Sequence, residues 1–221
     1  MPEIISQPMR RRAFLQRGAL AGAGVLFLGQ ARSTAQANAS HLHLALLSDT
    51  HIPANPVEEY RGFQPWKNLD QIAPRVAAIK PAGVIINGDA ARLAGLPGDY
   101  EQLQLLLRPI TEVAPVCIGM GNHDDRGNFL KAFTNLAWKP AGVTGRHVTV
   151  IDHPLVRIVQ LDSLLYVDKV AGLLGKAQRE WLTEFLAGPD QRPVVLFVHH
   201  TLSDGDGDPL DVDRLFAILK P

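Results

Sequence analysis

Side chains suited to metal binding follow directly after apolar, strand-like segments at four places in the sequence. The segments are residues 42–48, 83–87, 116–120 and 194–198, and the polar residues after them are Asp49, His51, Asp89, Asn122, His123, Asp124, Asp125, His199 and His200. In an α/β sheet, ligands bind at the carboxyl ends of the strands. Carboxylate, amide and imidazole groups are ligands for a hard or borderline metal ion. The pattern therefore predicts a metal site at one edge of a sheet.

Such a set of groups could hold two metal ions. A carboxylate with two free oxygens can bridge two ions, which lie about 3.5 to 4 Å apart in two-metal sites. The ions then polarise a phosphoryl oxygen and hold a deprotonated water in line with the leaving group. Any one of these residues alone could instead cap a helix or satisfy a turn. It is the four motifs together that favour a metal site.

Strands and helices alternate in the part of the sequence that would position these residues. Residues 41–48, 84–86 and 116–120 have the composition of strands, and apolar residues recur at helical spacing over 66–80. Asp99 is expected to be the N-cap of a second helix that Pro109 ends. This β-α-β-α-β succession predicts parallel strands covered by helices.

The second half of the sequence predicts a different arrangement. Residues 146–151 and 156–161 have the pattern of an antiparallel pair of strands. A helix within 174–186, a strand at 194–198 and a helix at 211–219 follow. With 46% hydrophobic residues, residues 40–221 can bury one substantial core and are predicted to form a single domain.

The four motifs, in this order and each directly after a strand, resemble those of the calcineurin-like metallophosphoesterases. They are Asp49-x-His51, Gly88-Asp89, Gly121-Asn122-His123-Asp124 and His199-His200. Residues 161–163, 172–175 and 178–182 also resemble the segment that exported, cyclic-nucleotide-phosphodiesterase-like members carry before the last of these motifs. The resemblance covers essentially all of residues 40–221. It implies an α/β fold, a two-sheet α/β/β/α sandwich of the metallophosphoesterase type, incomplete at the C-terminus.

The resemblance also implies a role for each matched residue. The metal ligands would be Asp49, His51, Asp89, Asn122 and His199. Asp89 would bridge two divalent or mixed-valence ions of iron, manganese or zinc. His123 would be the catalytic residue that donates a proton to the leaving oxygen.

Three further polar residues are expected to support these groups rather than to bind metal. Adjacent side chains at a strand end diverge, so only one of His199 and His200 is expected to bind metal. The family resemblance assigns that role to His199 and implies that His200 lies beside the metal shell or faces the substrate. Asp124 and Asp125 are expected to orient His123.

These features predict a metal-dependent hydrolase of phosphate mono- or diesters. A metal-bridging hydroxide would attack phosphorus, and His123 would protonate the departing alkoxide. The substrate is expected to be a small-molecule phosphoester. Nucleic acid is not expected as a partner, because residues 40–221 carry 17 basic and 21 acidic side chains.

The alternative is a non-catalytic metal- or partner-binding relative, or an inactive fragment. Members of the resembled family carry a further motif, Gly-His-x-His, and this motif does not occur in the 221 residues. The sequence also stops just after the amphipathic segment 211–219. We therefore expect a truncated form of a longer protein, with weak metal binding and little activity.

Residues 1–39 have the features of an export signal. They contain five arginines and one acidic residue, including the pair Arg11-Arg12, followed by a mildly apolar stretch at 18–29 and small residues near position 37. This order is typical of a signal peptide, and the arginine pair resembles the twin-arginine class. The apolar stretch is shorter than the roughly 20 residues that a stable membrane span needs. We expect export by the twin-arginine machinery to a periplasmic or secreted location.

Overall fold

The structure is a computed structural model that describes residues 41–134, 138, 140–203, 205 and 207–220. The predicted signal peptide, residues 1–39, lies outside the described residues. Within the described part of the chain, no helix has both the length and the apolar character needed to cross a membrane.

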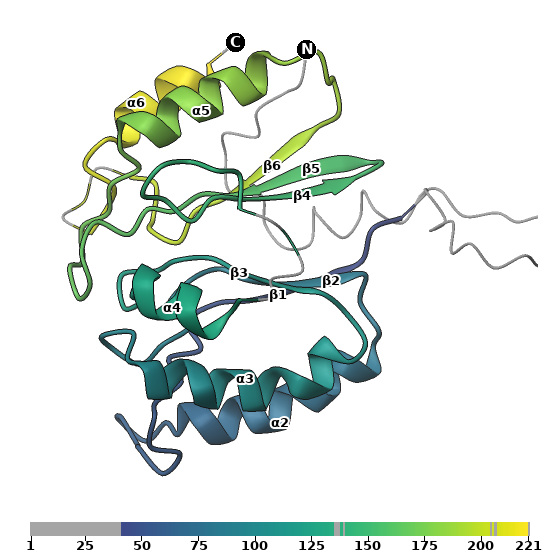
Figure 1. Ribbon diagram of the computed structural model, residues 1–221, viewed down its shortest axis with the longest axis vertical. Helices are drawn as coiled ribbons and strands as arrows, with labels where there is room; N and C mark the ends of the chain where they lie inside the picture. Colours follow the sequence, from purple (N-terminus) through teal and green to yellow (C-terminus); the bar gives the residue numbers. More distant parts are fainter. Residues whose placement is uncertain (1–40, 135–137, 139, 204, 206, 221) are drawn as a thin grey trace, which may run out of the picture. The chain divides into compact units, whose positions relative to one another are not determined.

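Three parallel strands form the first sheet. They are β1 (Leu44–Leu47), β2 (Gly83–Ile86) and β3 (Val116–Ile118), in the order β1-β2-β3. Parallel neighbours need long crossover connections, and α2 (Pro65–Ala78) and α3 (Pro97–Thr111) provide them. Both helices lie on the outer face of this sheet (Figure 1). The predicted β-α-β-α-β succession is confirmed.

Both ends of α3 differ from the prediction. Asp99 is not the N-cap, because the helix begins at Pro97, whose missing N–H costs nothing in the first turn. The carboxylate of Asp99 instead accepts hydrogen bonds from the backbone N–H groups of Leu96, at 3.1 Å, and Ala54, at 2.8 Å. Pro109 does not end the helix either, which continues to Thr111. At that position only the last turn loses a hydrogen bond.

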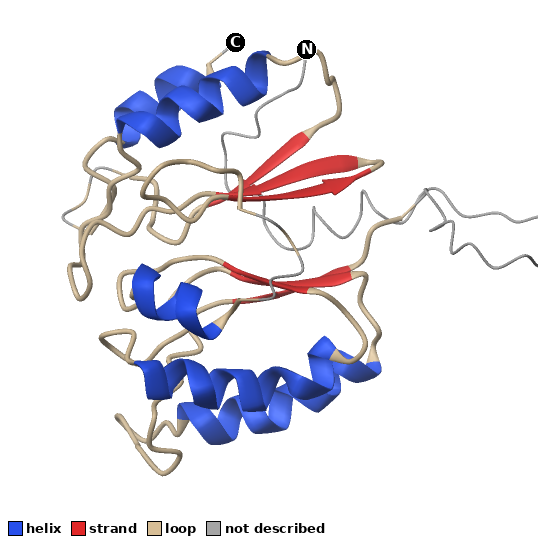
Figure 2. Ribbon diagram, in the orientation of Figure 1, coloured by secondary structure: helices blue, strands red, loops and turns tan. Residues whose placement is uncertain are grey.

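The second sheet is mixed. The strands β4 (Thr149–His153) and β5 (Val156–Gln160) are antiparallel, as predicted, and β6 (Val194–Phe197) pairs with β5 in parallel. The helices α5 (Lys176–Ala187) and α6 (Val212–Leu219) cover the outer face of this sheet (Figure 2).

The inner faces of the two sheets pack against each other. Ile85 and Cys117 from the first sheet meet Ile151 and Ile158 from the second in one buried cluster. Gln160 adds a hydrogen bond across the interface, from its Nε2 to the carbonyl of Ile86 at 2.8 Å. Burying each large aliphatic side chain stabilises the fold by about 1.5 to 3 kcal/mol. The predicted α/β/β/α sandwich is confirmed.

Two larger clusters join the helices to the sheets. Buried side chains of α3 pack with Phe129 of α4 (Arg126–Ala132) under the first sheet. Leu182 of α5 and Leu215 of α6 pack under the second. The strand ends are thus held between layers whose positions are set by apolar packing.

Candidate metal centre

The loops that follow β1 and β2 run side by side beyond the ends of the strands. The backbone N–H of Asp49 donates to the carbonyl of Gly88 at 3.2 Å, and that of His51 donates to the carbonyl of Asp89 at 2.9 Å. Ile52 and Ala90 continue the pairing at 2.9 Å. This extended pairing brings the polar residues of the first two motifs together.

Asp49, His51 and Asp89 all have positive φ, of 54°, 45° and 48°. For residues other than glycine this left-handed conformation costs about 1 to 3 kcal/mol, and it persists only where the surrounding structure holds it. Such residues are common at ligand-binding sites. Three of the six non-glycine residues with positive φ in the described part of the chain therefore lie at this one place.

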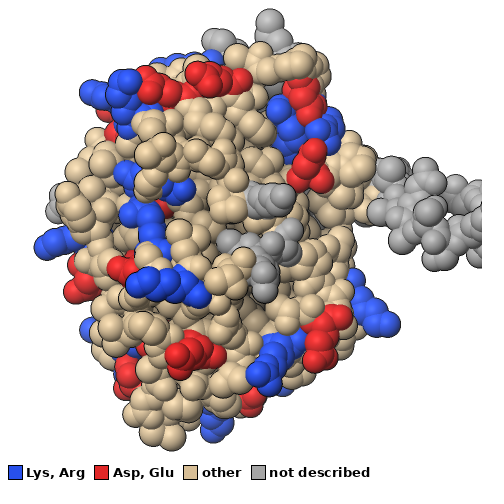
Figure 3. All heavy atoms as spheres, viewed as in Figure 1, with Lys and Arg blue, Asp and Glu red and all other residues tan. Residues whose placement is uncertain are grey.

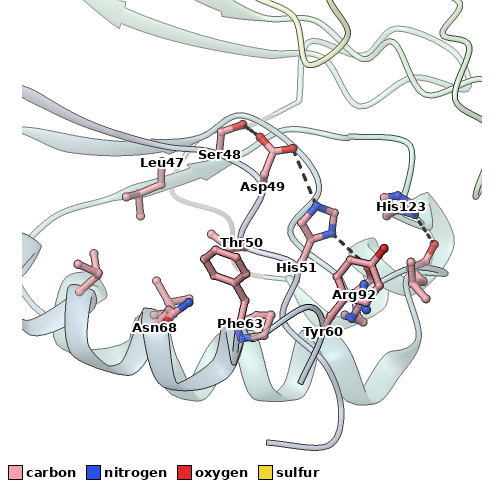
Figure 4. A pocket seen from close by; sticks show the side chains of 14 residues that line it. Leu47, Ser48, Asp49, Thr50, His51, Tyr60, Phe63, Asn68, Arg92 and His123 are labelled. Atoms are coloured by element: carbon pink, nitrogen blue, oxygen red, sulfur yellow. Dashed lines mark hydrogen bonds and ion pairs between the residues drawn. The ribbon is translucent and has the colours of Figure 1, made fainter. Parts of the chain in front are cut away.

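Three of the predicted ligands form one cluster. Asp49, Asp89 and His199 each offer a ligand atom, and these atoms all lie within 4.8 Å of one another. The Nε2 atoms of His51 and His199 lie 3.6 Å and 3.5 Å from Oδ2 of Asp89. His51 Nε2 is also 4.0 Å from Oδ1 of Asp49, and Figure 4 shows the two side chains facing each other. Both sheets therefore contribute to the cluster, since His199 follows β6.

The two imidazoles are oriented by hydrogen bonds behind them. Nδ1 of His51 lies 3.1 Å from the carbonyl oxygen of Arg92, and Nδ1 of His199 lies 2.8 Å from that of Asn87. Each ring can donate its Nδ1–H to a carbonyl and turn an unprotonated Nε2 toward the carboxylates. Metal-binding histidines usually have such a partner behind the ring. The donor set and its orientation fit a divalent metal ion.

Asp89 and His199 stabilise each other's charged forms. Burial by itself would raise the pKa of Asp89, but His199 and the backbone of His123 bring it below its ordinary value. Burial likewise opposes the charge on His199, yet the carboxylate of Asp89 raises the pKa of His199 to about 9. A carboxylate that stays ionised is suited to binding a cation.

Glycines allow the loops to approach Asp89 closely. A Cβ at Gly121 would lie 2.1 Å from Oδ1 of Asp89, and one at Gly88 would lie 2.7 Å from Nδ1 of His199. Neither position has room for a side chain. The glycines of the second and third motifs are therefore required by packing around the carboxylate.

The loop after β3 brings His123 to the same carboxylate. The backbone N–H of His123 donates to Oδ1 of Asp89 at 2.9 Å. Asn122 lies between this residue and Gly121, so its backbone also runs beside Asp89. Nδ1 of the His123 ring is 2.9 Å from the carbonyl oxygen of Leu93, and the rings of His51 and His123 have their centroids 5.3 Å apart.

Asp124 does not orient the His123 ring as the sequence had suggested. Its fully buried carboxylate accepts hydrogen bonds from the backbone N–H groups of Ala90, Ala91 and Gly121, at 2.9 to 3.3 Å, and from the Tyr100 hydroxyl at 3.2 Å. Four donors from three segments occupy it. Asp124 thus supports the site by holding the second and third loops together.

Asp125 has a structural role as well. Its carboxylate accepts a hydrogen bond from the backbone N–H of Asn128 at 2.7 Å and caps α4. The predicted orienting group for His123 is therefore neither of the two adjacent aspartates.

His200 points away from the cluster. Its ring is nearly perpendicular to that of His199, at 88°, and its Nδ1 lies 2.6 Å from the Ser163 hydroxyl. Burial lowers the pKa of His200 to about 4, so the ring is neutral at physiological pH. His199 and His200 thus face different surroundings, as expected, although both lie beyond the end of β6 rather than on the strand.

An open cavity of about 760 Å³ lies beside the cluster. Asp49, His51 and His123 form one part of its wall, and Tyr60 and Phe63 line another (Figure 4). These two aromatic residues belong to the loop between β1 and α2.

Several groups at the site carry no sequence signal. The carbonyls of Arg92 and Leu93, which hold two imidazoles, are backbone atoms and could belong to any residue type. Asp168 lies in a loop without a motif, yet its Oδ1 is 3.5 Å from Nδ1 of His123. Tyr100 could have been assigned only to the core. Contacts such as these depend on the folded arrangement.

Comparisons with known proteins agree on one family. Residues 42–220 match the family described as calcineurin-like phosphoesterase. A probable cyclic nucleotide phosphodiesterase of Rhodopseudomonas palustris is 33% identical over 178 residues, 79% of this chain and 62% of that protein. Another from Rhodococcus erythropolis is 29% identical over 168 residues, covering 71% of this chain and 51% of the relative.

A solved structure supports the fold. The dimetal phosphatase from Danio rerio superposes with a TM-score of 0.59 and 14% identity, covering 80% of this chain and 77% of that one. By contrast, the chain spans only 51% to 62% of the lengths of the two bacterial relatives.

Proposed function

Since the chain belongs to the calcineurin-like phosphoesterase family, we propose that it hydrolyses phosphoric mono- or diesters with bound divalent metal ions. The observation that carries the proposal is the convergence of Asp49, Asp89 and His199 within 4.8 Å, with Nε2 of His51 facing the same carboxylates. Carboxylate and imidazole donors in this arrangement are suited to manganese, iron or zinc.

We propose that the site holds two ions, with Asp89 between them. The position of Asp89 supports this role, because its carboxylate faces both His51 and His199. These two histidines follow strands of different sheets. Asp49 and His51 would hold one ion, and Asn122 and His199 the other. When bound, such ions neutralise charge on a phosphoryl oxygen and lower the pKa of water.

His123 is proposed as the general acid. Donation of its Nδ1–H to the carbonyl of Leu93 would leave Nε2 available to the substrate. The ring lines the cavity beside Asp49 and His51, where a phosphoester bound at the metal site would lie. For this step both ring nitrogens would carry a proton: His123 would transfer the Nε2 proton to the leaving oxygen, keep the Nδ1 proton, and so prevent release of an unstable alkoxide.

We propose a small-molecule phosphodiester as the preferred substrate. The two bacterial relatives are named as probable cyclic nucleotide phosphodiesterases. The cavity beside the metal site offers aromatic walls at Tyr60 and Phe63 for the organic part of such a molecule. On the face shown in Figure 3, basic and acidic side chains are interspersed, which does not favour a polyanion such as nucleic acid on that face.

Export by the twin-arginine route, to the periplasm or the medium, is part of the proposal. It rests on Arg11-Arg12 and the apolar stretch after them. Changing both arginines to lysine should leave unprocessed precursor in the cytoplasm, as measured by fractionation and immunoblotting. Normal processing of that double variant would refute the twin-arginine assignment.

The hydrolase proposal can be tested with the purified 221-residue chain. Hydrolysis of p-nitrophenyl phosphate and bis-p-nitrophenyl phosphate would be followed with added Mn²⁺, Zn²⁺ or Fe²⁺ and with a chelator. We expect at least weak turnover that depends on added metal, and we expect Asp89→Ala to abolish it. Metal binding without turnover of either ester would contradict the proposed activity and favour a binding role.

A further inference from the structure

We propose that Asp168 is a positioning residue for His123, a role that rests on the proposed function of His123 as the general acid. Asp168 lies in the 164–172 loop, which we define as the segment between β5 and α5 closed by the bridge between Leu164 and Gly172. The four recognised motifs lie elsewhere in the sequence.

Asp168 contacts two consecutive residues of the third motif. Its backbone N–H donates to the carbonyl of Asn122 at 2.7 Å. Its carboxylate Oδ1 lies 3.5 Å from Nδ1 of His123. The backbone of Asp168 thus binds the loop after β3, while its side chain faces the imidazole of His123.

The loop holds Asp168 in a conformation that aspartate seldom adopts. Its φ is 60°, in the left-handed region that it shares with Asp49, His51 and Asp89. Such a conformation persists where surrounding contacts hold it. The hydrogen bond to Asn122 is one such contact, and it keeps the carboxylate on the side of His123.

The base of the loop packs against His200, the residue next to the proposed ligand His199. Leu173 donates its N–H to the carbonyl of Ser163 at 2.8 Å, and the Ser163 hydroxyl contacts the His200 ring. The backbone of Gly172 packs closely against that ring, because a Cβ at this position would be 2.8 Å from Cγ of His200. The loop is therefore fastened at both its base and its tip.

Two acceptors on one side of the His123 ring determine how the ring is placed. Nδ1 faces both the Leu93 carbonyl oxygen, at 2.9 Å, and the Asp168 carboxylate. Rotating the ring by half a turn would place a C–H group against two oxygens. A proton on Nδ1 is favoured for the same reason. Asp168 therefore keeps Nε2 directed at the substrate.

Three variants separate the side chain from the backbone. Asp168→Gly removes the carboxylate, and glycine accepts a φ of 60° without strain. Asp168→Asn keeps an oxygen acceptor on a residue that tolerates the left-handed region. Lys169→Ala changes an exposed neighbour in the same loop and serves as the matched control.

The first measurement needs no turnover. Long-range ¹H–¹⁵N spectra of the histidine rings would be recorded on the full 221-residue chain, with His123→Ala to assign the signals. We expect a proton on Nδ1 of His123 in wild type, Asp168→Asn and Lys169→Ala, and a larger share of rings protonated on Nε2 alone in Asp168→Gly. An unchanged His123 spectrum in Asp168→Gly would overturn the proposal.

The second measurement uses two leaving groups. With Mn²⁺ present, Asp168→Gly should lower kcat for an alkyl phosphoester by about tenfold, a fraction of the effect of a general acid, with KM little changed. The loss should be smaller for p-nitrophenyl phosphate, and Asp168→Asn should restore most of it. Equal losses for both esters would contradict positioning of the acid. If wild type itself turns over neither ester, the hydrolase proposal fails, while the ring spectra still decide the role of Asp168.

Discussion

Asp89 and Asp162 are both buried carboxylates that follow strands, but they lie in regions with different supplies of hydrogen-bond donors. Asp89 accepts one backbone hydrogen bond, from His123, and otherwise faces the Nε2 atoms of two imidazoles. Asp162 accepts two hydrogen bonds from the guanidinium of Arg126, at 2.5 and 2.8 Å, and others from backbone N–H groups nearby.

The difference separates a binding group from a structural one. The oxygens of Asp162 are occupied by permanent donors, so this carboxylate joins segments of the fold. Oδ2 of Asp89 faces the Nε2 atoms of two imidazoles, which can bind a cation when they carry no proton. Oδ2 of Asp89 is therefore accessible to a bound cation, whereas the oxygens of Asp162 are already paired, so the hydrogen-bond donors around the two carboxylates distinguish them better than burial does.

The largest effect should follow from removing Asp89. Asp89→Ala removes the carboxylate that faces both His51 and His199, and leaves less negative charge to hold cations together. We expect metal content, measured by inductively coupled plasma mass spectrometry after dialysis, to fall more than in Asp49→Ala or His199→Ala. Metal content close to that of wild type would show that Asp89 is not the carboxylate on which metal binding depends.

Removing His123 should leave the metal ions in place. His123→Ala is expected to lower kcat by about 10² to 10⁴, the usual contribution of a general acid. Substrates with acidic leaving groups should lose least, because they need little protonation. Comparing kcat for aryl and alkyl phosphoesters measures this, and equal losses would argue against the assigned role.

Asp162 should affect stability and leave metal affinity intact. Asp162→Ala leaves the Arg126 guanidinium without its partner and several backbone donors unsatisfied. Breaking such a buried pair costs about 3 to 5 kcal/mol, which urea denaturation would measure. Glu180→Ala, at an exposed ion pair with Lys176, is the control and should change the midpoint little. If Asp162→Ala were as stable as wild type but lost metal, Asp162 would be a metal-binding residue rather than a structural one.

The smallest effect concerns pH, through His147 beside Asp162. Burial lowers the pKa of His147 below its ordinary value of 6.5. Below about pH 6.5 the unfolded chain therefore binds a proton that the native ring does not. The free energy of unfolding decreases as the pH is lowered, by up to about 1.4 kcal/mol per pH unit. His147→Phe, which keeps a ring against Phe129, should reduce this dependence. An unchanged slope between pH 5 and 6.5 would show that His147 does not titrate on unfolding.

Much of this arrangement could be predicted from the sequence because it depends on local patterns. Apolar runs that end in polar residues located the strand ends, and the order of elements indicated that those ends share an edge. Asp49, Asp89 and His199 could be grouped on that basis alone, and they do converge. The antiparallel pair and the final helix were also predicted.

The remaining details depend on groups brought together from distant parts of the chain. Asp89 and Asp162 look alike in the sequence, since each follows an apolar segment. Only the fold brings Arg126 to one of them and His199 to the other. Asp124 was likewise assigned to His123 by adjacency, but four more distant donors occupy its carboxylate. Adjacency in sequence is a weak guide to side-chain partners.

The most direct test of the metal centre is the position of a bound ion. Crystals of the 221-residue chain grown with Mn²⁺ would be measured for anomalous scattering at the manganese edge. We predict an anomalous peak from Mn²⁺ in contact with Asp49, Asp89 and His199. Ordered Mn²⁺ elsewhere in the molecule, with no peak at these residues, would contradict it.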